Sequence, residues 1–83
     1  MSYSLDIDPR AQATIAALPA DALPVLAEVL TVLELTPWNG RPVNPDNPDG
    51  AVRNMAFGAG MITYLVLEEE RRVDVLLIAW AGN

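Results

Sequence analysis

Three residue types that supply much of enzyme chemistry are absent from this chain of 83 residues. Without cysteine it has no disulfide, no thiol nucleophile and no thiolate metal site. Without histidine it lacks the usual general base and the commonest metal ligand. Without lysine it has no side chain for Schiff-base chemistry. We therefore expect no cofactor and no metal.

Positive charge is also scarce. Five arginines stand against eleven carboxylates, which gives a net charge of -6 and a pI near 4.2. This balance argues against generic binding to a phosphate backbone, which needs a basic surface. It fits a soluble protein, or one whose partner is basic. No segment approaches the roughly 20 apolar residues that span a bilayer, and the N-terminus lacks a secretory signal, so we expect a cytoplasmic protein.

Apolar residues, by contrast, are abundant at 52%. A domain this short buries only about 60–65% of its unfolded surface, so its core is thin. Either the core is unusually rich, or part of the apolar surface binds a partner or a second copy. We expect some of both, because large exposed apolar patches usually mark binding sites.

Two helices are predicted after a first strand. Residues 3–8 alternate apolar and polar side chains, as in a half-buried strand. Asp8 followed by Pro9 is typical of a helix start, and the helix should end at Pro19. Asp21 is expected to cap a second helix whose apolar stripes leave only a narrow polar face.

The last third of the chain predicts an antiparallel meander. Its strands are residues 51–57, 61–67 and 71–79, joined by a Gly-x-Gly corner and an acidic turn. The last two strands are apolar on both faces, which indicates that both faces of the sheet are covered. On the last strand we expect Val73, Val75 and Leu77 to share one face. Residues 36–50, with four prolines, are expected to form an irregular loop.

The order β-α-α-β-β-β predicts a single α+β domain over residues 1–83. We expect a four-stranded, antiparallel-rich sheet with a two-helix hairpin on one face. The first strand should find an edge beside the second strand of the meander.

This ordered set resembles the RelE/ParE superfamily of bacterial type II toxin–antitoxin toxins. The matching features are the strand from Tyr3 to Pro9, the helix ending Ala17-Leu18-Pro19, Pro37-Trp38, Arg53 before the glycine corner, Tyr64, and the last strand Val73-x-Val75-Leu76-x-Ile78. The resemblance implies a protein antitoxin as partner. It also implies one of two targets, the ribosome with its mRNA, which RelE-like toxins cleave, or DNA gyrase, which ParE-like toxins poison.

For a nuclease, the resemblance implies catalysis by Arg53, which would stabilise the phosphorane, by Tyr64, which would orient, and by Arg41 as an auxiliary group. The family's nucleases carry an arginine where this chain has Met61. They also carry an arginine and a tyrosine where it has Trp80 to Asn83. The alternative is therefore a non-catalytic interaction module that has lost the basic active face.

The candidate residues also have structural interpretations. Arg53 could pair with Glu68, Glu69 or Glu70 across the sheet, and Tyr64 could be a core aromatic residue. Trp38 and Arg41 could form a stacking platform for a base, or Trp38 could close the end of the core. Residues 68–72 are expected to form a solvated hairpin turn.

Overall fold

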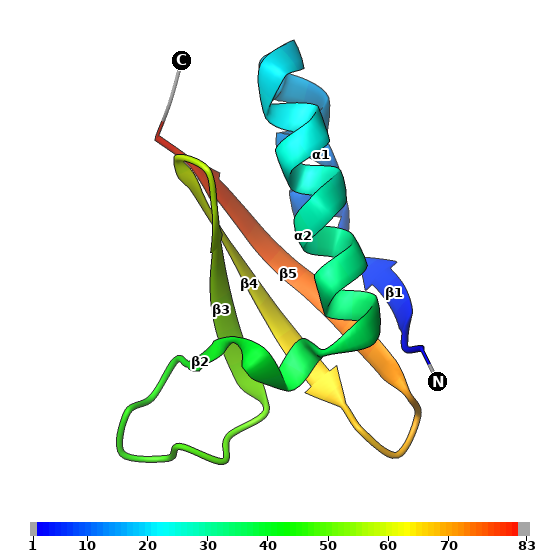
Figure 1. Ribbon diagram of the computed structural model, residues 1–83, viewed down its shortest axis with the longest axis vertical. Coiled ribbons are helices and arrows are strands. Elements are labelled where there is room, and N and C mark those ends of the chain that lie inside the picture. Colours follow the sequence, from blue (N-terminus) through cyan, green and yellow to red (C-terminus); the bar gives the residue numbers. More distant parts are fainter. Residues whose placement is uncertain (1, 82–83) are drawn as a thin grey trace.

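The computed structural model describes residues 2–81. It is a mixed sheet with two helices against one face (Figure 1). The elements are β1 (Ser4–Ile7), α1 (Pro9–Ala17), the 3-10 turn η1 (Ala20–Ala22), α2 (Leu23–Leu35), the 3-10 turn η2 (Pro37–Asn39), β2 (Arg41–Pro42), β3 (Val52–Phe57), β4 (Gly60–Leu67) and β5 (Arg72–Trp80). The predicted α+β class with a helical hairpin on one face is confirmed.

The start of α1 follows the sequence signal, whereas the start of α2 does not. The Asp8 carboxylate accepts a hydrogen bond from the backbone N–H of Arg10, and Pro9 occupies the first turn. Asp21 lies inside η1, and α2 begins after Ala22 without a side-chain cap. The predicted cap was wrong because the chain bends between the helices through a 3-10 turn, whose own hydrogen bonds replace a capped start.

No single helix within residues 2–81 has the length and apolarity needed to cross a bilayer. The two helical segments pass that criterion only when they are counted together, across a bend of 120°.

The sheet has five strands in the order β1-β5-β4-β3-β2, one more than predicted. The extra strand, β2, lies in the segment expected to be an irregular loop, where η2 also forms. The first strand does not lie beside the second strand of the meander, because β4 already has β3 and β5 on its two edges. It pairs instead with β5, and the pairing is parallel.

The helical hairpin explains this parallel pairing. It returns the chain to the end of the sheet where β1 began, and the backbone N–H of Tyr3 donates to the carbonyl of Glu34 at 2.8 Å. From that end β3 runs in the direction of β1, β4 runs back, and β5 runs forward again. β5 is therefore parallel to β1, while the three pairs within β2–β5 are antiparallel.

A β-bulge reverses the faces of the second half of β5. Thr63 lies opposite Leu77 but Tyr64 lies opposite Val75, so Leu76 is an extra residue on β5. Val73, Val75 and Ile78 are buried beneath the helices, whereas Leu77 is exposed. The predicted grouping of Leu77 with the two valines was wrong for this reason, since one inserted residue shifts the two-residue alternation.

Candidate functional site

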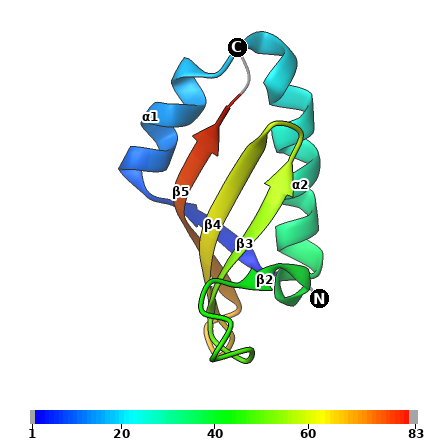
Figure 2. The same ribbon diagram turned by 90° about the vertical axis from the view of Figure 1, so that its left-hand side faces the viewer.

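One face of the sheet carries no helix, and Figure 2 looks toward it, with α1 to the left and α2 to the right of the strands. We call it the open face. Cross-strand partners point to the same side, so the register gives its residues: Ser4, Asp6, Arg41, Val52, Asn54, Ala56, Met61, Thr63, Leu65, Leu67, Arg72, Asp74, Leu77 and Ala79. Its centre is apolar, and Val52, Met61 and Leu77 are well exposed.

The charges on the open face cancel. Two arginines, Arg41 and Arg72, stand against two aspartates, Asp6 and Asp74. Arg72 is already held by Asp74, with Nε 2.8 Å from a carboxylate oxygen. This hydrogen bond raises the pKa of Arg72. The described residues therefore place one unpaired cation, Arg41, on this face, which is not the basic cluster that RNA binding requires.

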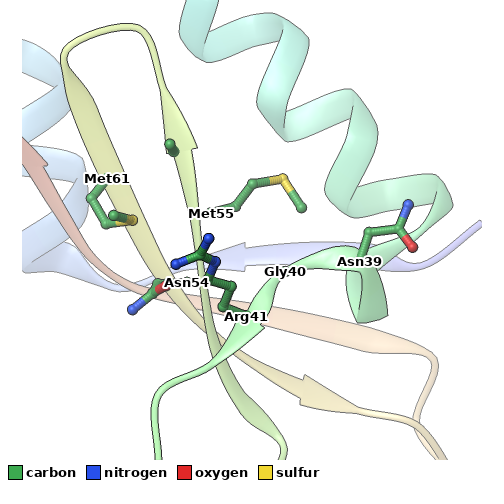
Figure 3. A pocket seen from close by; sticks show the side chains of 7 residues that line it. Asn39, Gly40, Arg41, Asn54, Met55 and Met61 are labelled. Carbon is green, nitrogen blue, oxygen red and sulfur yellow. The ribbon is translucent and has the colours of Figure 1, made fainter. Parts of the chain in front are cut away.

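Arg41 lines a hollow of about 420 Å³ at the β2–β3 end of the open face (Figure 3). The residues around it are Asn39, Gly40, Arg41, Asn54, Met55, Ala56 and Met61. Met61, one of these residues, occupies the sequence position at which the resemblance places an arginine. On the open-face side, the hollow therefore offers the guanidinium of Arg41, the amide of Asn54 and the thioether of Met61. The side chains of Asn39 and Met55 lie on the α2 side of β3 (Figure 3).

Arg53 does not reach the open face. Its side chain points to the helix side, is 8% exposed, and donates four hydrogen bonds to backbone carbonyls. Nε donates to Gly50 at 3.0 Å, one terminal nitrogen to Trp38 and Gly40 at 3.0 Å each, and the other to Pro48 at 2.6 Å. The guanidinium also lies 4.8 Å from the Trp38 ring centroid. The expected pairing with the acidic turn was wrong, because these carbonyls take its donors.

Tyr64 is fully buried beside Arg53 on the helix side of β4. Its hydroxyl donates to the Pro37 carbonyl at 2.6 Å. Burial raises its pKa, an effect opposed by hydrogen bonding from the Gly40 backbone and by the charge of Arg53. Of the three residues implied as catalytic, only Arg41 is exposed on the open face, and the other two together hold residues 37–50 against the sheet.

The acidic turn is not simply solvated. The Glu68 carboxylate accepts hydrogen bonds from the Tyr3 hydroxyl at 2.6 Å, Trp38 Nε1 at 2.7 Å and Arg71 at 2.7 Å. The Arg71 guanidinium lies 4.0 Å from the Tyr3 ring centroid, and Arg71 has a positive φ of 52° in the β4–β5 turn. We call these four residues the Glu68 clasp; it ties β1, η2 and the β4–β5 turn together.

The Glu68 clasp makes stability depend on pH. Hydrogen bonds from Trp38 and Tyr3 lower the pKa of Glu68 below its usual 4.5. A lowered folded-state pKa contributes stability that is complete above the unfolded value and is lost as pH falls through the folded one. We expect Glu68→Gln to unfold at lower urea than the wild type at pH 7, with the difference shrinking below pH 4.5. Glu69→Gln is the matched control. A Glu68→Gln deficit that is unchanged at pH 3 would contradict the clasp.

A second surface lies at the edge of β3. β2 covers only the start of β3: Val43 N–H donates to the Val52 carbonyl, and the pairing reaches Asn54. Along a strand, the backbone groups of every second residue point to the same side. Because those of Val52 point toward β2, those of Ala56 also point away from β4. Figure 2 shows α2 running alongside this edge. A groove of about 300 Å³ lies between them, lined by Val25, Glu28, Val29, Val32, Met55, Ala56, Phe57 and Gly58.

We call this second surface the β3–α2 groove. The sequence did not predict this groove, because a local pattern of residues does not show which strands become neighbours in the sheet. The one signal was the narrow polar face of α2, which required a cover on a second side.

Comparison with solved structures identifies the fold as that of the RelE toxins. A chain of the intact Escherichia coli RelBE toxin–antitoxin complex superposes with a TM-score of 0.78 at 19% identity, covering 98% of this chain and 99% of that one. A free E. coli RelE with two arginines replaced by alanine gives 0.78 at 21%, covering 99% and 86%. The RelBE2 complex of Mycobacterium tuberculosis gives 0.74 at 19%, covering 96% and 99%.

At these identities the likeness establishes the fold. The predicted RelE/ParE-like fold is thus confirmed. No known family profile matches the sequence, and no curated protein matches it.

Proposed function

We propose that this protein is the toxin-fold member of a type II toxin–antitoxin pair, and that it acts in the cytoplasm by binding proteins rather than by cleaving RNA. The fold and the antitoxin complexes among its structural neighbours support the pairing. The observation that carries the mode of action is the open face, which is apolar at its centre and electrically neutral. Phosphoryl-transfer catalysis rests on positioned positive charge, and this face offers one unpaired arginine.

The β3–α2 groove is the proposed antitoxin site. An extended segment can pair with the free backbone groups of Ala56 and place apolar side chains against Val25 and Val32 on α2. Glu28 at the groove and the net charge of -6 favour a basic segment. A partner with an apolar, basic tail fits both features.

Co-expression with the product of each gene that adjoins this one tests this proposal. Val32→Asp places a charge in the groove and should weaken capture of the partner by roughly 10- to 100-fold. Leu35→Asp is the matched control, since Leu35 lies on the same helix, is 60% exposed and does not line the groove. Equal capture by both variants would place the partner elsewhere, and growth that is indifferent to the neighbouring gene would argue against a toxin pair.

Arg41 supports a second candidate function, ribosome-dependent mRNA cleavage. It is exposed beside a hollow large enough for a nucleotide base, and the amide of Asn54 lies beside it on the same face. Translation in vitro followed by primer extension on the message separates the two candidates. Under the protein-binding proposal the message stays intact at saturating protein. Cleavage that Arg41→Ala abolishes would establish the nuclease instead. Gyrase remains a candidate target for the binding mode.

A further inference from the structure

We infer that the open face binds a second copy of this chain, forming a two-fold symmetric dimer with the two sheets face to face. The inference does not depend on the proposed antitoxin pairing, because that pairing uses a different surface, the β3–α2 groove. The central side chains, Met61, Leu65 and Leu77, are apolar, and two of them are well exposed. Such a surface resembles the apolar centre of a homodimer interface.

The charges on the open face are arranged across the sheet rather than scattered. Strand order places Asp6 on the β1 edge, beside Asp74 in the parallel register. Arg41 stands on β2, at the opposite edge. Asp74 is paired with Arg72, whereas neither Asp6 nor Arg41 has an ion-pair partner among residues 2–81. One edge therefore offers an unpaired carboxylate and the other an unpaired guanidinium.

A two-fold axis between the sheets can satisfy both charges. If the axis runs along the strands, it places β1 of one copy over β2 of the other, so that Asp6 faces Arg41 twice per dimer. If it runs across the strands, it places Asp6 over Asp6 and Arg41 over Arg41, which is repulsive. Asp6 lies in the same cross-strand row as Val52, and Arg41 lies in the row of Asn54, two residues further along β3. The offset along the strands is therefore about 6–7 Å, which an arginine side chain can span.

The same charges favour a second copy over other partners. Nucleic acid requires a basic surface, and this face has no net charge. A basic polypeptide would be drawn to the carboxylates elsewhere on a chain of net charge -6. A self-complementary face with a neutral, apolar centre fits a two-fold interface, in which the same patch serves both subunits.

Analytical ultracentrifugation of the full chain tests the inference. The wild type should sediment as a dimer of 9.0 kDa subunits at micromolar concentration. Leu77→Asp, at a residue 50% exposed on the open face, should raise the dimer dissociation constant by roughly 100-fold or more. Leu35→Asp, the same change on α2, should leave it unaltered. A wild type that is monomeric up to millimolar concentration, or a Leu77→Asp variant that still forms the dimer, would overturn the inference.

A charge exchange tests the orientation of the axis. Asp6→Arg and Arg41→Asp should each weaken the dimer by roughly 10-fold, because each leaves like charges opposed. The double variant restores opposite charges and should regain most of the wild-type affinity. No recovery in the double variant would overturn the proposed pairing of β1 with β2. Circular dichroism and thermal melting show whether each variant is folded, and every variant site is exposed.

Discussion

Arg53→Ala is expected to lower the free energy of unfolding by about 3–4 kcal/mol, because it removes four hydrogen bonds from a buried charged donor. The carbonyls that lose their donor belong to Trp38, Gly40, Pro48 and Gly50. Residues 38–50 should therefore detach from the sheet. Urea unfolding measures the loss, and limited proteolysis should show faster cleavage between residues 43 and 50.

Arg53→Lys separates the charge from the fork geometry. An ammonium keeps the positive charge but cannot donate in four fixed directions. The free energy of unfolding of Arg53→Lys should therefore fall between those of the wild type and Arg53→Ala. Arg41→Ala is the matched control, and its effect should stay within about 0.5 kcal/mol, as for other exposed side chains. An Arg53→Ala protein that unfolds at the wild-type urea concentration would show that the loop is held by other contacts.

Gly40→Ala is expected to be the second costly change, at about 2–3 kcal/mol, through overpacking. The backbone at Gly40 is extended, with a φ of -69°, so the requirement for glycine is one of space rather than conformation. A β-carbon there would overlap the Tyr64 hydroxyl and lie 2.9 Å from the Asn54 carbonyl oxygen. Thermal or urea unfolding measures the loss.

Tyr64→Phe shows how much of that cost comes from the hydroxyl. Alone it should cost about 1–2 kcal/mol, since it leaves the buried Pro37 carbonyl without a donor. In the Tyr64→Phe background, Gly40→Ala should cost roughly 1 kcal/mol less than in the wild type, because the closest overlap is gone. The Asn54 contact remains, so recovery is partial. Strictly additive costs would contradict direct packing of residues 40 and 64.

These expectations reassign two residues that the sequence presented as catalytic candidates. An arginine and a tyrosine near a glycine corner match the family pattern equally well whether they face a substrate or the core. The strand register decides between the two orientations. Arg53 is the cross-strand partner of Tyr64, and both side chains are buried on the helix side of the sheet. We therefore propose structural roles for both, with Arg41 the remaining candidate for contact with a ligand on the open face.

Local patterns in the sequence determined much of the fold. The helix start at Asp8-Pro9, the glycine corner, the inner faces of β3 and β4 and the RelE-like order of elements all follow from interactions between residues close in sequence. Only the tertiary structure decided the parallel place of β1, the bulge at Leu76, the carbonyls around Arg53 and the donors around Glu68. These features join residues far apart in the chain. Each side chain could bond equally well with several partners, and the packing of the helical hairpin on the sheet brings one set of partners within hydrogen-bonding distance.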